Sequence, residues 1–284
     1  MRKDAPIGVF DSGVGGLTVA REIIRQIPNE RIVYFGDTAR LPYGTKSKDT
    51  IIRYARQIVN FLMDEGVKAI VVACNTASAY ALEEIKDEIE VPIIGVVKPG
   101  ARTAVSVTKN NRIGIIATEG TINSGLYTRL IHEENPDIEV VGKACPLLVS
   151  LVEEGWLHDS ITDQVLERYL ESLKRENIDT LVLGCTHYPL LRSSIGKIMG
   201  DKVNLVNPAY ETALELKRLL AKKELANVKD VEEPSVMYRF YVSDAAEKFK
   251  NIANMILPFD IETTKQINIC LLYTSDAADD LTRV

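Results

Sequence analysis

The sequence has few cysteines and histidines for its length. Its 284 residues include four cysteines and three histidines, and none of them form a CxxC or HxxxH pair. Neither a disulfide scaffold nor a metal site of the usual zinc spacing is therefore predicted. We expect free thiols, and Cys145 and Cys270 lie in settings that suggest only structural roles.

Long apolar runs and an excess of basic residues are also missing. No stretch approaches the ~20 consecutive apolar residues of a membrane span, and the N-terminal residues turn polar too soon for a secretory signal. Lys and Arg number 34 against 40 Asp and Glu, a formal net charge of −6, whereas nucleic-acid or anionic-membrane surfaces favour the opposite balance. We expect a cytoplasmic protein with no nucleic-acid and no membrane partner.

What the chain does have is an alternation of short apolar runs and amphipathic segments. Eight runs are typical of strands: Ile7–Phe10, Ile32–Phe35, Ala69–Ala73, Ile93–Val97, Ile113–Ala117, Glu139–Val141, Thr180–Gly184 and Val203–Val206. Helical spacing of apolar residues predicts helices between them, including Leu17–Gln26, Thr50–Glu65, Ala77–Glu88, Thr162–Glu176 and Tyr210–Lys222. This pattern predicts an α/β fold with mainly parallel sheets flanked by helices.

A weak internal repeat suggests that the chain has two similar halves. Residues 66–74 resemble residues 177–185, and each copy ends in a small residue followed by cysteine. Two similar α/β halves would place Cys74 and Cys185 at corresponding strand ends. Ligands of such sheets bind beyond the carboxyl ends of the strands.

Two turn-rich segments follow predicted strands. The cluster of residues 11–16, DSGVGG, lacks both the GxGxxG and the GxxxxGK[ST] spacing. Its backbone N–H groups could still receive a small anion at a helix start, or the segment could be only a tight turn. The loop Gly36–Gly44 is either a rigid surface loop or a source of Pro-Tyr-Gly backbone donors for a carboxylate.

The two cysteine segments are the strongest signals for a functional site. Cys74 and Cys185 each stand at a predicted strand end before a helix or turn, where a helix N-terminus can stabilise a thiolate, so such a thiol can ionise near neutral pH. Asn75, Thr76 and Thr186 are suitable anchors for a small zwitterion. His187 could accept or supply a proton for the Cys185 thiol. Either cysteine alone would favour an inert core residue, whereas two cysteines in matched settings favour a function.

Together these segments resemble the glutamate racemases of the aspartate/glutamate racemase superfamily. The residues that carry the resemblance are FDSGVGGLTV, YFGDTARLPYGTKS, VVACNTASA, IIGVVKPGA and LVLGCTHYPLL, distributed in the family's order between Ile7 and about Ile256. The resemblance implies a cofactor-independent two-base racemase, whose substrate lies in the cleft between two pseudo-symmetric domains. It also implies a homodimer and the supply of D-glutamate for peptidoglycan.

The resemblance assigns roles residue by residue. Cys74 would deprotonate D-glutamate with help from Asp11, and Cys185 would deprotonate L-glutamate with help from His187. Glu153 matches a carboxylate near Cys185, although the adjacent Glu154 is a competing match. The remaining substrate-contact positions are Ser12, Pro42, Tyr43, Gly44, Asn75, Thr76, Thr121 and Thr186.

The resemblance also implies the domain organisation. The second domain, 98–207, would be inserted into the first, 1–97 plus 208–269, which agrees with possible joints at Lys98 and Asn207. Residues 270–284 depart from the family and are expected to be a disordered or foreign tail. No lysine motif for pyridoxal phosphate is evident, since Lys98 is better explained as part of a joint.

Three other functions are compatible with the same residues. A racemase of aspartate or a related acid would use the same thiols with a different pocket. A thiol hydrolase could use Cys185 as nucleophile and His187 as base, which leaves Cys74 without a role. A binding protein could keep the cleft without catalysis.

Overall fold

The computed structural model describes residues 2–229 and 233–272, and these contain two sheets. The first sheet has the order β10-β9-β2-β1-β3-β4 and the second β6-β5-β7-β8, and every strand pair in them is parallel. The strands of the first sheet are β1 (Ile7–Asp11), β2 (Ile32–Gly36), β3 (Ala69–Val72), β4 (Ile93–Gly95), β9 (Tyr238–Val242) and β10 (Lys265–Gln266). Those of the second are β5 (Arg112–Ala117), β6 (Glu139–Ala144), β7 (Thr180–Gly184) and β8 (Asn204–Val206). The predicted α/β class is confirmed.

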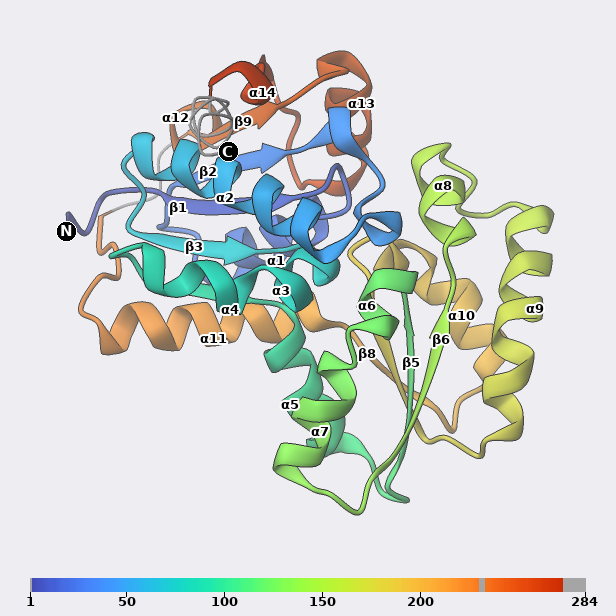
Figure 1. Cartoon of the computed structure of the whole chain (residues 1–284). Coiled ribbons are helices and arrows are strands. Elements are labelled where there is room, and N and C mark those ends of the chain that lie inside the picture. The colour runs from blue at the N-terminus through green and yellow to red at the C-terminus, as the bar shows by residue number, and fades with distance from the viewer. Residues whose placement is uncertain (1, 230–232, 273–284) are drawn as a thin grey trace, which may run out of the picture.

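Helices cover both faces of the first sheet (Figure 1). One face packs against α1 (Leu17–Gln26), α11 (Pro208–Lys222) and α13 (Ala246–Ile256). The other packs against α2 (Lys48–Asp64), α3 (Asn75–Tyr80) and α4 (Leu82–Ile85). In β1, Val9 faces the first of these cores and Phe10 the second. Burial on both faces explains why the central strands are continuous apolar runs.

The second sheet is covered in the same way. The core on one face includes residues of α5 (Val97–Val107) and α7 (Leu126–Glu134). The core on the other includes residues of α8 (Leu147–Glu153), α9 (Ser160–Arg175) and α10 (Arg192–Met199), while the short α6 (Glu119–Asn123) follows β5. No helix in the part of the chain that the structure describes is long and apolar enough to cross a membrane.

The two sheets share a strand order that reflects the internal repeat. The segment β2-β1-β3-β4 of the first sheet corresponds to the whole second sheet, β6-β5-β7-β8. Cys74 comes shortly after β3, and Cys185 directly follows β7, which holds the same place in its own sheet. The repeat therefore delivers one thiol to the carboxyl edge of each sheet.

The chain passes between the sheets through helices rather than loops. Lys98, expected at a joint, lies in the first turn of α5, and Asn207 caps α11 by accepting a hydrogen bond from the backbone N–H of Ala209 (3.1 Å). Helices α5 and α11 pack against each other, where the chain crosses from one half to the other (Figure 1). The domain boundaries at 97/98 and 207/208 stay a prediction.

Three segments differ from the expected elements. The helix predicted over Ala77–Glu88 is divided into α3, α4 and a 3₁₀ turn. The Ser78 hydroxyl of α3 donates to the carbonyl of Val72 at the end of β3 (2.9 Å). Strand β9 was not predicted, although its residues YRFYV are good strand formers. Of the expected tail, residues 270–272 complete α14 (Ile269–Leu272), and residues 273–284 lie outside the described residues.

Candidate active site

The thiols of Cys74 and Cys185 line one cavity between the two sheets. The cavity has a volume of about 20 Å³, which is room for about one water molecule. Its other lining residues are Ser12, Leu41, Pro42, Tyr43, Gly44, Asn75, Thr76, Thr118, Val149, Thr186 and His187. The structure therefore brings together ten of the predicted site residues, including His187.

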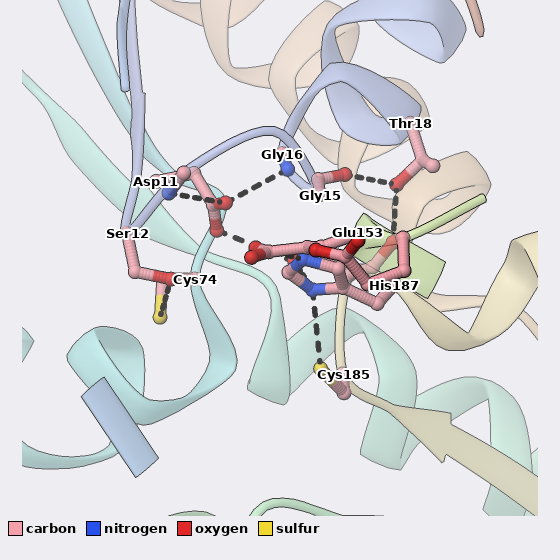
Figure 2. A network of polar contacts seen from close by, with 12 residues as sticks. Asp11, Ser12, Gly15, Gly16, Thr18, Cys74, Glu153, Cys185 and His187 are labelled. Carbon is pink, nitrogen blue, oxygen red and sulfur yellow. Dashed lines mark hydrogen bonds and ion pairs between the residues drawn. The ribbon is translucent and has the colours of Figure 1, made fainter. Parts of the chain in front are cut away.

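Cys185 is the first member of a chain of three side chains (Figure 2). The Nδ1 atom of His187 lies 3.7 Å from the sulfur of Cys185, and its Nε2 atom lies 3.0 Å from a carboxylate oxygen of Glu153 at the end of α8. Burial alone would lower the pKa of His187, but the hydrogen bonds to Cys185 and Glu153 raise it to about 10. The competing residue, Glu154, instead pairs with Lys248 on the surface (3.1 Å).

Cys74 has a different environment. Its sulfur lies 3.9 Å from the hydroxyl of Ser12. Burial and the nearby charge of Asp11 raise the pKa of Cys74 to about 12, although hydrogen bonds with the backbone of Ala77 and with Ser12 oppose the shift. Burial therefore outweighs the effect of the place of Cys74 at the start of the short helix α3 and favours the protonated thiol.

Asp11 receives the backbone donors of the glycine cluster. One oxygen of its fully buried carboxylate accepts hydrogen bonds from the N–H groups of Gly13 (3.0 Å) and Gly16 (2.9 Å), and the other accepts from the hydroxyl of Thr186 (3.3 Å). Burial raises the pKa of Asp11, and its hydrogen bonds and His187 oppose that shift. The anion at the glycine turn is thus a side chain of this protein, and the turn does not offer these donors to a ligand.

Gly15 allows the glycine cluster to approach the second sheet closely. A Cβ atom at this position would lie 2.4 Å from the hydroxyl oxygen of Thr186 and 2.5 Å from Nδ1 of His187, so only glycine fits. The neighbouring hydroxyl of Thr18 donates to the carbonyls of both Gly15 (2.9 Å) and Thr186 (3.0 Å), as Figure 2 shows. These contacts fix the segment after Cys185 against the start of α1.

Three threonine hydroxyls join the halves on the other side of the cavity. The oxygen of Thr76 in α3 lies 2.8 Å from that of Thr118 and 3.2 Å from that of Thr121, and the last two are 3.0 Å apart. Thr76 and Thr118 line the cavity, whereas Thr121 supports them from behind. Asp11 and Glu153 likewise lie outside the lining. Each is hydrogen-bonded to a lining residue, Asp11 to Thr186 and Glu153 to His187.

The loop Pro42–Gly44 lines the cavity, and a buried ionic network holds it in place. The Tyr43 hydroxyl donates to Asp37, which also accepts from Arg40 (2.7 Å) and from the hydroxyl of Ser243 in the segment after β9 (2.9 Å). Since the phenol of Tyr43 is already bonded to Asp37, the group that this residue can offer to a ligand is its main chain. This supporting network was not predicted from the sequence.

Three lining residues were not predicted as site residues: Leu41, Thr118 and Val149. A signal existed for Thr118: it follows β5 directly, as Ser12 follows β1, so the repeat pairs the two positions. Nothing comparable marks Leu41 or Val149. Within the described residues, no group of three or more His, Cys, Asp or Glu side chains is arranged to hold a metal ion.

Comparisons with known proteins all indicate the same family. The family model for Asp/Glu/Hydantoin racemase matches residues 7–215. A glutamate racemase from Neisseria meningitidis serogroup B is 49% identical over 268 residues, covering 94% of this chain and 98% of the relative. A glutamate racemase from Geobacter metallireducens is 46% identical over 263 residues, covering 93% and 96% of the two chains.

A solved structure agrees with these relatives. The glutamate racemase from Francisella tularensis, crystallised in complex with D-glutamate, superposes with a TM-score of 0.87 at 41% identity. The match covers 94% of this chain and 98% of that one. The chain therefore belongs to the Asp/Glu/Hydantoin racemase family, whose members are isomerases.

Proposed function

We propose that the protein interconverts L- and D-glutamate without a cofactor, with Cys74 and Cys185 as two bases on opposite faces of the α-carbon. The observation that carries this proposal is that thiols from corresponding strands of the two sheets line a single cavity. We propose glutamate as the substrate because the relatives are glutamate racemases and the match covers nearly their whole length. The bound D-glutamate of the Francisella structure supports the same choice.

The chemistry needs two groups because inversion removes a proton from one face and delivers a proton to the other. In the L-to-D direction the Cys185 thiolate takes the α-proton, so that the C–H bond breaks and an S–H bond forms. The Cys74 thiol then gives its proton to the opposite face, and the new C–H bond forms. After turnover the thiol and the thiolate have changed places, and proton exchange with water resets them.

The surroundings of the two sulfurs support this starting state. The pKa of Cys74 near 12 keeps its proton in place, and the Asp11 charge contributes to that effect, which is how Asp11 would assist on the Cys74 side. The pKa of His187 near 10 keeps the imidazole cationic at neutral pH, so that a positive charge lies beside the sulfur of Cys185. The coupled thiols should give a bell-shaped pH profile.

The cavity also has the donors that a carbanionic transition state requires. Ser12, Thr76 and Thr118 bring hydroxyl groups and Asn75 brings an amide to the lining. A donor of this type contributes on the order of 3–4 kcal/mol in the transition state, so several are needed. They would hold the α-carboxylate, where negative charge develops.

Glutamate is much larger than the single water molecule for which the cavity has room. We therefore propose that the two halves, 1–97 plus 208–269 and 98–207, move apart to admit substrate and close over it. Closure excludes water and strengthens the polar contacts inside.

The test is isotope exchange in heavy water with each enantiomer in turn and no cofactor added. Proton NMR measures the loss of the α-hydrogen signal, while circular dichroism measures the ratio of the two enantiomers. Because different thiols remove and return the proton, deuterium should enter the product enantiomer first, while recovered substrate keeps its hydrogen. Equal early labelling of both enantiomers would point to a single base, and turnover of aspartate rather than glutamate would point to the sister activity.

A thiol hydrolase is a second candidate, because Cys185, His187 and Glu153 are arranged as a nucleophile, a base and its orienting carboxylate. That function has no use for Cys74. Under it, Cys74→Ser would be harmless, and a burst of covalent acyl-enzyme would accompany turnover of an ester.

The wider biological setting is part of the same proposal. The homodimer, the cytoplasmic location and the supply of D-glutamate for peptidoglycan follow from the resemblance and the sequence composition. Sedimentation would test the dimer, and rescue of a bacterial strain that requires D-glutamate would test the supply role.

A further inference from the structure

The residue that follows Cys74 is hydrogen-bonded by a side chain of the other half. Tyr127 lies in α7, which covers the second sheet, and its hydroxyl donates to Oδ1 of Asn75 in α3 (2.8 Å). Both side chains are buried, with 3% and 4% of their surface exposed. Tyr127 does not line the cavity, and no motif of the sequence drew attention to it.

This hydrogen bond determines which end of the Asn75 amide is free. A carboxamide has one acceptor oxygen and one NH₂ donor group. The Tyr127 hydroxyl occupies the oxygen, and Nδ2 has no hydrogen-bond partner within the described residues. Since Asn75 lines the cavity of the two thiols, its available group there is a donor.

The phenol ring that provides this hydroxyl is closely packed. A Cβ atom on Gly100 of α5 would lie 3.2 Å from the Tyr127 hydroxyl oxygen, and one on Gly184 at the end of β7 would lie 3.2 Å from Cε2 of the ring. Two glycines thus leave just enough room for the ring. The phenol is thus held between α5 and the end of β7, the strand that directly precedes Cys185.

A related contact exists on the other side of the cavity. Thr186, which follows Cys185, donates to Asp11 of the first sheet. Each residue directly after a cavity thiol is therefore hydrogen-bonded to the opposite half. These bonds require the two halves to be together.

We propose that Tyr127 is a positioning residue, which orients the Asn75 carboxamide so that its NH₂ group donates to the anionic substrate when the halves close. This inference rests on the proposed function for the identity of the substrate. Without the hydroxyl, the carboxamide can rotate and present its oxygen to the substrate, which repels a carboxylate. The loss should therefore weaken binding more than it slows proton transfer.

The test compares Tyr127→Phe, Asn75→Ala and the double variant with the wild type, using D-glutamate. Tyr127→Phe should raise KM about tenfold and change kcat by less than about threefold. Because both changes remove the same interaction, the double variant should have the KM of Asn75→Ala alone. An unchanged KM in Tyr127→Phe, or multiplied effects in the double variant, would overturn the proposal.

Tyr169→Phe is the matched control. Its hydroxyl accepts a hydrogen bond from the backbone N–H of Leu147 (3.4 Å) in the same half but outside the cavity. This variant should keep the wild-type KM, and thermal unfolding should show that Tyr127→Phe is folded.

A second readout needs no turnover. The side-chain amide signal of Asn75 in ¹⁵N-labelled protein, assigned by its loss in Asn75→Ala, should move in Tyr127→Phe toward the position of a free carboxamide. An unmoved signal would contradict the orienting role even in a protein that does not racemise glutamate. If the Asn75 signal moves in Tyr127→Phe but the wild-type protein is inactive on glutamate, the orienting role stands and only the proposed substrate is rejected.

Discussion

Asp11 and Thr186 form a hydrogen bond between the two sheets: the hydroxyl of Thr186 donates to the Asp11 carboxylate (3.3 Å), although 175 residues separate them. Asp11 ends β1 of the first sheet, and Thr186 follows Cys185 after β7 of the second. The Asp11 charge also helps to keep Cys74 protonated. One carboxylate thus acts on the surroundings of both sulfurs.

The two-base mechanism predicts that Cys74→Ala and Cys185→Ala each abolish racemisation, since each removes the only proton carrier on one face. We expect kcat/KM to fall by roughly 10³-fold or more in both directions. Circular dichroism of L- and D-glutamate solutions measures the loss.

Cys145→Ala is the control for these variants. Cys145 is also fully buried, but in the core of the second half and outside the cavity lining. It should retain activity and lose on the order of 1 kcal/mol of stability. Normal racemisation by either cavity variant would exclude the two-base mechanism.

Glu153→Gln should lower the pKa of His187, because it removes a carboxylate that helps to raise that pKa to about 10. The alkaline limb of the pH–kcat/KM profile should then move to lower pH, and activity at pH 9 should fall more than activity at pH 7. Glu154→Gln, next to it but paired with Lys248 at the surface, should leave the profile unchanged. Equal profiles for the two variants would mean that Glu153 does not act on His187.

The raised pKa of His187 also predicts how stability depends on pH. Its pKa is about 10 in the folded protein against 6.5 for the free group, so the folded state binds the proton more tightly. The stabilisation is complete below pH 6.5 and is lost as pH rises toward 10, at no more than about 1.4 kcal/mol per pH unit.

Urea unfolding at pH 7 and pH 9, under reducing conditions, measures this dependence. The free energy of unfolding should fall more steeply between these two values in the wild type than in His187→Asn. If the variant shows the same fall, the dependence has another origin.

Gly15→Ala should strongly reduce activity, because its methyl group would clash with Thr186 and His187. A shift of about 1 Å at a catalytic group can cost on the order of 100-fold in rate. The control is Gly196→Ala inside α10, where a Cβ atom meets nothing closer than 3.6 Å. This change should preserve activity and add roughly 0.5–1 kcal/mol of stability. A fully active Gly15→Ala would show that the segment can relax.

The sequence predicted the parts of the site that depend on local pattern. Apolar runs locate the central strands, and a cysteine at the end of two related runs locates both thiols, because parallel strands deliver their carboxyl ends to one edge. Ser12, Asn75 and Thr186 could be predicted for the same reason, since they adjoin those strand ends.

The missed features depend on contacts between distant segments. Tyr127 acts through the packing of α7 near α3, and Thr118 through the meeting of α6 with the opposite half. The pKa of Cys74 depends on burial, which the local sequence does not reveal. Strand β9 was missed because short apolar runs after a polar stretch carry little periodicity.

The shared strand order of the two sheets has a consequence for kinetics. Two polypeptides of L-amino acids can be superposed only by rotation, whereas the enantiomers of glutamate are related by reflection. No pseudo-twofold axis can therefore make the protein handle both enantiomers alike. Since the enantiomers have equal free energy in water, kcat/KM must be equal in the two directions, but kcat and KM taken separately are free to differ. Unequal Michaelis constants for L- and D-glutamate are therefore expected, because a chiral protein with nearly twofold symmetry still contacts the two enantiomers differently.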